Sequence, residues 1–202
     1  MGPKGAAGYP DDMPAEDAEL VRSDVTRNRA ALLDAAAEVL ASAPQASLSE
    51  IAATAGLGRA TLYRHFPSRE ALQAALREEA LARAGAALAG ADLEACATRE
   101  AVRRAVAVLV PLGVRFRILL AEGVDADEEF VAARTAVLAP LWAALARGVE
   151  RGELRAGTDP AWAALVLAGL LVTAARGAAV GLVTPERAPD LVVGAFFDGH
   201  GP

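Results

Sequence analysis

Cysteine, histidine and aromatic residues are scarce in this chain, and each shortage excludes a class of protein. The one cysteine, Cys96, cannot close an intramolecular disulfide, and two histidines add too few ligands for a structural metal site. The N-terminus also lacks the apolar stretch of a secretory signal, so we expect a cytoplasmic protein that needs neither a metal nor another cofactor. Aromatic residues make up only 4% of the chain and alternating strand-like runs are few, which favours helices.

The motifs of common enzyme classes are missing as well. The sequence has no Gly-x-Ser-x-Gly elbow, phosphate-binding loop, paired His and Asp constellation, or glycine-rich nucleotide fingerprint after a strand. These absences predict that the chain is not an enzyme.

A surplus of positive charge is also missing, since 26 acidic residues face 20 basic ones and the net charge is −6. Such a balance counts against nucleic-acid binding, because Lys and Arg supply the contacts to phosphate. Four of the six negative charges, however, belong to residues 1–25, which we expect to form a disordered acidic tail. With 54% hydrophobic residues overall, the rest of the chain can build a sizeable core in one or two domains.

Apolar residues at spacings of three and four predict a series of helices after this tail. Pro44 ends the first of them, and Ser47 with Glu50 forms a Ser-x-x-Glu capping box for the second. The second and third are joined by the turn Gly56-Leu57-Gly58, and two short helices joined in this way are the signature of a helix-turn-helix. We expect the helices of this part at residues 26–43, 48–55, 59–66 and from 69 onward.

The third of these helices has two different faces. Leu62 and Phe66 are expected to pack inward against the second helix. The polar residues that stay available outside are Arg59, Thr61, Tyr63, Arg64 and His65. Three arginines and no acidic residue between Leu57 and Arg69 give a local charge of +3, which fits a helix that lies against phosphates.

The second half of the sequence predicts further helices. Asp127 precedes a long one that contains Pro140, and the pair Asp159-Pro160 forms a cap and first turn for the next. That next helix has no charged residue from Ala161 to Ala175 and is too short and too rich in Ala and Gly to span a membrane. We therefore expect it to be buried from both sides, in an all-α fold of about nine helices.

In order and spacing, three segments of the first half resemble the DNA-binding domain of the TetR family of transcriptional repressors. They are Leu33-Asp34-Ala35-Ala36, Ile51-Ala52-x-x-Ala55-Gly56 and the run from Thr61 to Leu72. The resemblance covers residues 27–76. It implies a helix-turn-helix DNA-binding domain at 26–72 and a helical effector-binding and dimerisation domain at 73–202. It also implies a homodimer that represses transcription from a palindromic operator in double-stranded DNA until a small-molecule effector releases it.

The resemblance also implies which residues contact DNA. Arg59 is the candidate for reading a guanine edge through two parallel hydrogen bonds, and Thr61 is the second candidate. Tyr63 and His65 match positions that bond the phosphate backbone, and Ser47 could hold a phosphate at a helix N-terminus. The full set of predicted contacts is Arg27, Arg29, Ser47, Arg59, Thr61, Tyr63, Arg64, His65 and Arg69.

In the second half the candidates are large side chains and whole helix faces. The large side chains that could line an effector pocket are Phe116, Leu120, Trp142 and Trp162. In the uncharged helix, we expect the face with Trp162 and Leu165 to meet the chain's own core. The opposite face and the last helix are expected to meet a second subunit in a four-helix bundle, through Leu167, Leu171, Ala174, Leu191 and Ala195.

One other class of protein explains a helix-turn-helix. A helical adaptor could use the same surface to bind another protein in place of DNA. Salt-sensitive binding to DNA separates the two interpretations, because only contacts to phosphate release counterions.

Overall fold

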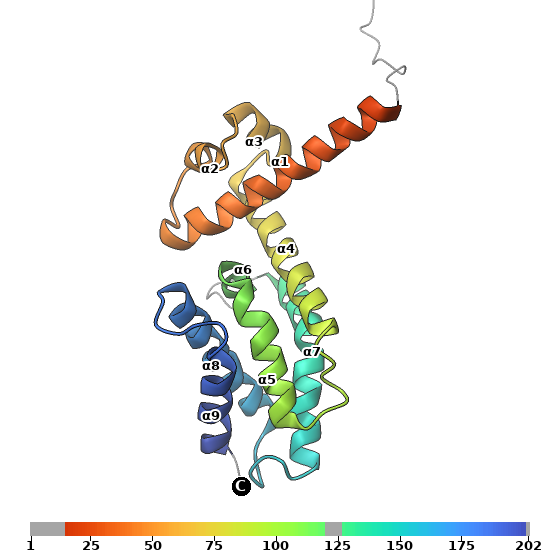
Figure 1. The fold of residues 1–202 in the computed structure, drawn as a ribbon, viewed down its shortest axis with the longest axis vertical. Helices are drawn as coiled ribbons and strands as arrows, with labels where there is room; N and C mark the ends of the chain where they lie inside the picture. Colours follow the sequence, from red (N-terminus) through yellow and green to blue (C-terminus); the bar gives the residue numbers. More distant parts are fainter. Residues whose placement is uncertain (1–14, 120–126, 201–202) are drawn as a thin grey trace, which may run out of the picture. The chain divides into compact units, whose positions relative to one another are not determined.

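All regular secondary structure in the part of the chain that the structure describes is helical, which confirms the predicted fold class. The structure is a computed structural model and describes residues 15–119 and 127–200, in which no strand occurs. These residues belong to two compact units, Met1–Arg69 and Glu70–Pro202 (Figure 1).

The first unit is a small three-helix domain. Its elements are α1 (Ala15–Ser42), α2 (Leu48–Thr54) and α3 (Arg59–His65), and α2 packs against both of the others. The core consists of apolar side chains that are at most 3% exposed: Leu32, Leu33, Ile51, Ala52, Leu62 and Phe66. These side chains come from all three helices and from Phe66, which follows α3, so one shared core holds the helix-turn-helix together.

Helix α1 begins well before the expected start at Thr26. The prediction of a disordered tail through residue 25 is wrong for residues 15–25, which belong to α1. This stretch contains Ala, Glu and Leu, which have high helix propensity, and extending an existing helix requires no second nucleation. Residues 23–27 are exposed, so the polar residues among them lie on a solvated helix surface.

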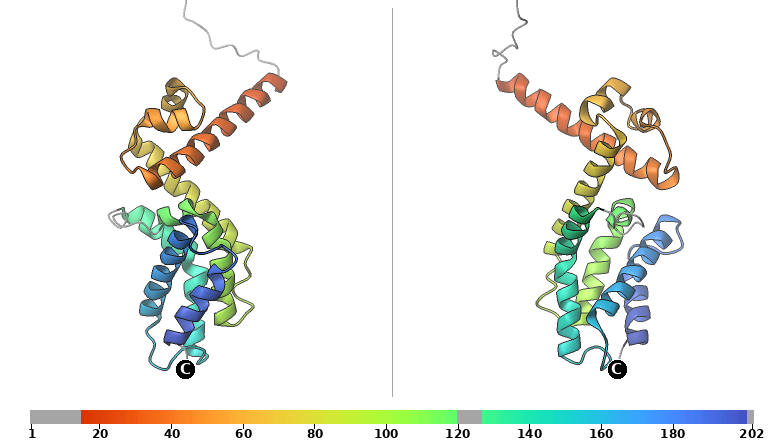
Figure 2. Two further views of the ribbon diagram at one scale, coloured as in Figure 1. Left: turned by 60° about the vertical axis from the view of Figure 1, so that its left-hand side comes forward. Right: turned by 180° about the vertical axis from the view of Figure 1, so that it is seen from behind.

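The second unit is a helical bundle organised around one central helix. Its elements are α4 (Arg69–Ala89), α5 (Thr98–Leu109), the 3₁₀ turn η1 (Val110–Leu112), α6 (Val114–Leu119), α7 (Glu128–Glu150), α8 (Pro160–Ala179) and α9 (Ala188–His200). Helix α5 lies between α7 and α9 and packs against both (Figures 1 and 2). Apolar stripes of α4 and of α5 with the start of η1 are buried in the chain: Leu72, Ala75, Leu76 and Ala80, and Val102, Val106, Leu109 and Val110.

The predicted helix starts of this unit are confirmed. Asp127 caps α7, since its Oδ1 accepts a hydrogen bond from the Phe130 N–H at 3.0 Å. Asp159 caps α8 in the same way, with the Ala161 N–H donating to Oδ1 at 2.8 Å and Pro160 in the first turn.

Helices α7 and α8 are long and apolar enough to cross a membrane when only length and composition are considered. Length and composition therefore do not exclude a membrane span for α8, contrary to the prediction. Core helices of globular proteins have the same composition. Both helices bury one side in the bundle, α7 through Leu141 and Leu145 and α8 through Leu167 and Leu171. We therefore assign both to the core of the second unit.

The crossing of α5 and α7 requires a glycine. Gly148 of α7 lies against Thr98 at the start of α5, and a Cβ added to Gly148 would lie 2.4 Å from Thr98 Oγ1. Thr98 cannot move freely, because its hydroxyl donates to the Ala144 carbonyl oxygen at 3.2 Å and its N–H donates to Glu153 Oε2 at 2.6 Å. Hydrogen bonds from Thr98, of which the one from its backbone has the largest effect, hold the pKa of Glu153 below its ordinary value.

Gly148→Ala should therefore lower the free energy of unfolding by about 2 kcal/mol, since a methyl group must be forced into a packed crossing. Gly85→Ala is the matched control in α4, where the nearest atoms would be Val137 methyl groups at 3.9 Å. That change should raise stability by about 0.5–1 kcal/mol, because alanine loses less backbone entropy in a helix. Urea unfolding of the three proteins measures both effects, and equal losses at the two sites would contradict the packing argument.

Candidate nucleic-acid interface

A capping box fixes the start of α2, as the sequence predicted. The Ser47 N–H donates to Glu50 Oε2 at 2.7 Å, and the Glu50 N–H donates to Ser47 Oγ at 3.2 Å. The hydrogen bond from the Ser47 backbone holds the pKa of Glu50 below its ordinary value. Two N–H groups at this helix end are already bonded and a carboxylate lies beside them, so the arrangement does not favour a phosphate held by Ser47.

The turn between α2 and α3 depends on one glycine. Gly56 has a φ of +68°, in the left-handed region that costs glycine no steric strain. The next N–H, that of Leu57, donates back to the Ala52 carbonyl oxygen at 2.9 Å. Gly58 then begins α3 as its N-cap, without a side-chain hydrogen bond. The chain therefore leaves one helix and enters the next within three residues.

Helix α3 presents an exposed and positively charged side. Leu62 and Phe66 are buried in the core of the first unit, as expected. Arg59, Tyr63 and Arg64 are exposed, Tyr63 by 44% of its surface. Arg59 and Tyr63 are four residues apart and so lie on the same side of the helix. This side can lie in a DNA groove, with base edges in front of it and phosphates around it.

The other predicted contacts of the first unit already have partners or partial cover. Thr61 is half-buried. Arg27 forms an ion pair with Asp24, one turn earlier in α1, which reduces its attraction for a phosphate. The Arg29 guanidinium lies 5.7 Å from the centre of the Phe66 ring, at the surface of the unit. Arg29 thus keeps its charge exposed while its position is held by an aromatic ring.

His65 is half-buried at the end of α3. Within the described residues, its Nε2 is a buried side-chain nitrogen without a hydrogen-bond partner. Burial lowers the pKa of His65 below 6.5, and the positive charges of Arg64 and Arg29 lower it further. In this arrangement Nε2 cannot reach a phosphate.

Arg69 has a role in this structure that the sequence did not reveal. It is the first residue of α4, and its Nη1 donates to the Ala46 carbonyl oxygen at 2.6 Å while Nη2 donates to that of Pro44. The acceptors are backbone groups 23 and 25 residues earlier in the chain. Such contacts leave no signal in the pattern of side chains, so a phosphate contact was the only role that residue type and position suggested.

The predicted pocket residues can be placed only in part. Trp142 is half-buried against the core of the second unit. Trp162 is 59% exposed, so its own chain does not enclose it, and its role as a pocket residue stays a prediction. Leu120 lies outside the described residues, and of Phe116 only the helical backbone is described.

Helix α8 packs against the core of its own chain with the side opposite to the one predicted. Trp162 and Leu165 are exposed, although they were predicted to face inward. Three residues predicted for the subunit interface are instead buried within their own chain, and the prediction is wrong for them: Leu167, Leu171 and Ala174. Both sides of the stretch 161–175 are apolar, so no charged residue marks the solvent side in the sequence. Packing against α7 and α9 decides the orientation.

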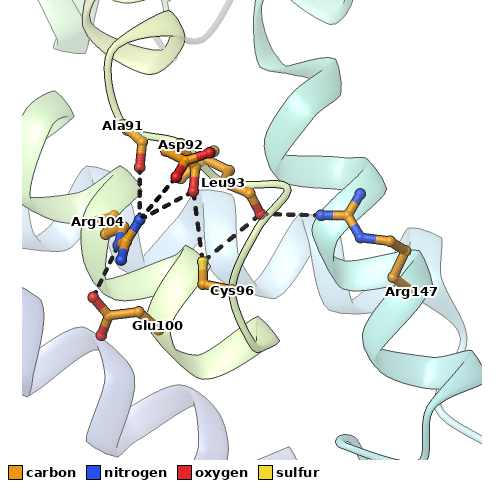
Figure 3. Close-up of polar contacts among 7 residues, drawn as sticks. All are labelled: Ala91, Asp92, Leu93, Cys96, Glu100, Arg104 and Arg147. Atoms are coloured by element: carbon orange, nitrogen blue, oxygen red, sulfur yellow. Dashed lines mark hydrogen bonds and ion pairs between the residues drawn. The ribbon is translucent and has the colours of Figure 1, made fainter.

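Arginine side chains also hold the connection between α4 and α5 (Figure 3). Arg104 Nη1 donates to the Asp92 carbonyl oxygen at 3.1 Å, and Arg147 Nη2 donates to that of Leu93 at the same distance. Cys96 lies in this connection, and its thiol is 3.7 and 3.8 Å from the same two oxygens. The cysteine is therefore part of a packed connection.

Comparison with known proteins indicates one family. The family model described as bacterial regulatory proteins, tetR family, matches residues 32–76. The chain is 42% identical over 87 residues to the HTH-type transcriptional repressor LfrR of Mycolicibacterium smegmatis. That match covers 43% of this chain and 46% of LfrR, so it spans less than half of the repressor.

Solved structures extend the likeness to most of the chain. The TetR-like transcriptional regulator LfrR from Mycobacterium smegmatis, crystallised in complex with proflavine, has a TM-score of 0.71 and 31% identity over 86% of this chain and 96% of its own. The TetR family regulator PfmR from Thermus thermophilus has a TM-score of 0.63 and 25% identity over 82% of this chain and 94% of its own.

Acid should weaken the fold through His65. Because the folded protein holds the pKa of this side chain below 6.5, the unfolded chain binds more protons as the pH falls through that value. The wild-type protein should therefore lose stability relative to His65→Gln as the pH falls below about 7, and the two should differ by a constant amount above it. Urea unfolding at several pH values measures the difference, and parallel curves down to the lowest pH would contradict it.

Proposed function

The chain belongs to the TetR family of bacterial regulatory proteins, and we propose that it is a repressor that binds a palindromic operator as a homodimer and is released by a small-molecule effector. It is a transcriptional regulator and not an enzyme. The proposal is carried by the exposed, positively charged side of α3, which lies within the segment that matches the family. We assign DNA binding to residues 26–72 and effector binding and dimerisation to residues 73–202.

The proposed contacts divide into those that read bases and those that position the protein. Arg59 begins α3 and is exposed, so its guanidinium can donate two parallel hydrogen bonds to guanine O6 and N7 in the major groove. Tyr63 and Arg64 lie further along the same helix and are exposed to neighbouring phosphates, as is Arg29 on α1. Phosphate contacts fix orientation, and therefore we assign sequence preference to Arg59.

An exposed apolar surface on the last two helices supports a homodimer. Leu165 is 63% exposed on α8, and Leu191 is 47% exposed on α9 near the exposed Ala195. Trp162 on α8 is also exposed, by 59% of its surface. Large apolar side chains exposed to water are typical of surfaces that bind a partner. A two-fold homodimer that binds adjacent half-sites of a palindromic operator needs its two α3 helices about 34–36 Å apart, which is one turn of DNA.

An effector can act through the link between α6 and α4. Arg115 of α6 donates to Glu79 of α4 at 3.2 Å, and the side chains are only 15% and 17% exposed. Burial lowers the pKa of Arg115. Helix α4 starts where the first unit ends. A movement of α6 would therefore be transmitted through α4 to the DNA-binding unit. A ligand acts in this way only if it binds the form that does not bind DNA more tightly.

LfrR provides a first effector to test, since that relative was crystallised with proflavine. Proflavine titrated into the complex of this protein with DNA should release the DNA. Binding of proflavine at an unchanged DNA affinity would contradict release by a compound of this kind.

Arg59→Ala should reduce affinity for a duplex selected by the wild-type protein from random-sequence DNA by about 10- to 100-fold, because the variant cannot form a bidentate contact to guanine. Arg151→Ala removes the same charge from an exposed position of the second unit and should have little effect. Both variants should keep the wild-type circular dichroism spectrum. If the wild-type protein binds no duplex from the pool in a salt-sensitive manner, DNA binding is rejected and a helical adaptor is favoured.

Leu165→Glu should convert the dimer into monomers, because a carboxylate would be buried without a partner at the proposed interface. Operator affinity should fall with it, since a monomer holds one half-site only. Ala82→Glu, at an exposed position of α4, is the control for added charge. Sedimentation equilibrium measures the outcome, and a Leu165→Glu dimer as tight as that of the control would place the interface elsewhere.

A further inference from the structure

Arg69, the first residue of α4, bonds to the link between α1 and α2. Its two terminal nitrogens donate to the carbonyl oxygens of Ala46 and Pro44, and the side chain is half-buried. Ala46 is itself buried, and its N–H donates to the Ala43 carbonyl oxygen at 3.0 Å. The guanidinium group is therefore built into the first unit and bonded on two sides.

The positive charge of Arg69 is more favourable beside these carbonyl groups than at the N-terminal end of α4. The two acceptors lie two and four residues beyond the end of α1. The C-terminal end of a helix carries partial negative charge, and the last turn of α1 contains no basic residue. At the N-terminus of α4, in contrast, a positive charge is unfavourable. The two bonds to the link offset this cost. A guanidinium fork can donate to two separate carbonyl groups in this geometry, whereas a lysine ammonium is a single point charge.

The link that Arg69 holds determines where α2 begins. Ser47, the N-cap of α2, follows Ala46 directly, and the capping box with Glu50 starts there. Helix α3 follows α2 after a short turn. A shift of the link would therefore shift both helices of the helix-turn-helix relative to α1.

We propose that Arg69 is a positioning residue for DNA binding, which holds the α1–α2 link through two backbone carbonyl groups and makes no contact with phosphate. The inference rests on the proposed DNA-binding function. It opposes the role that residue type suggests, because a phosphate contact requires only the positive charge, whereas this role requires the fork.

Two substitutions separate these roles. Arg69→Lys keeps the charge and removes the fork, and Arg69→Gln removes both. Arg64→Gln serves as the control that removes a proposed phosphate contact, since Arg64 is exposed on α3. Affinity for the selected duplex is measured between about 50 and 200 mM salt, at a temperature where circular dichroism shows every variant to be folded.

We expect both Arg69 variants to bind about tenfold more weakly than the wild-type protein, which corresponds to one net hydrogen bond to a charged group. Their slopes of log affinity against log salt should equal the wild-type slope. Arg64→Gln should instead reduce the magnitude of the slope by about 0.9 for each phosphate that the variant no longer neutralises. Hydrogen exchange should be faster at the Ala46 and Glu50 amides of both Arg69 variants than in the wild-type protein.

Three results would overturn this role. Wild-type affinity for Arg69→Lys with a reduced slope for Arg69→Gln would make Arg69 a phosphate contact. Unchanged affinity for both variants, with only a lower melting temperature, would limit Arg69 to stabilising the fold. Unchanged exchange at Ala46 and Glu50 would remove the clamp itself. Failure of the wild-type protein to bind DNA would be recognised separately, because it rejects the proposed function and the positioning role together.

Discussion

Arginine side chains that donate to backbone carbonyl groups hold the connections after α1 and α4. Nineteen of the chain's 20 basic residues are arginine. Arg69 bonds the link after α1, and Arg104 and Arg147 bond the connection after α4. A forked guanidinium can donate to two acceptors while its charge meets the negative end of a helix dipole. The connections between helices are therefore held by side chains from outside them.

Each unit leaves a chemically distinct surface uncovered. The first unit exposes the charged side of α3, while Leu62 and Phe66 secure the helix from behind. The second unit exposes an apolar surface with Leu165 and Leu191, while α5 fills the centre of the bundle. One surface suits phosphates and base edges and the other suits a second apolar surface. A net charge of −6 is compatible with both, since local charge decides the contact.

Features that depend on neighbouring residues could be predicted, and features that depend on distant ones could not. The capping box of Ser47 and Glu50, the turn at Gly56 and the cap Asp127 each require only a few consecutive residues, and the structure confirms all three. The start of α1 was missed because acidic residues are typical of tails as well as of solvated helices. The orientation of α8 was wrong because its sequence is apolar on both sides.

Periodicity, caps and a turn of fixed spacing are local properties of the chain, so the family, the all-α fold and the charged side of the third helix could be predicted from the sequence. Tertiary structure alone decided that Leu167 and Leu171 face inward and that Arg69 bonds the carbonyl groups of residues 44 and 46. A helix that is apolar all round is oriented only by what packs against it. A backbone acceptor is the same at every residue, so only the fold determines which one a guanidinium group meets.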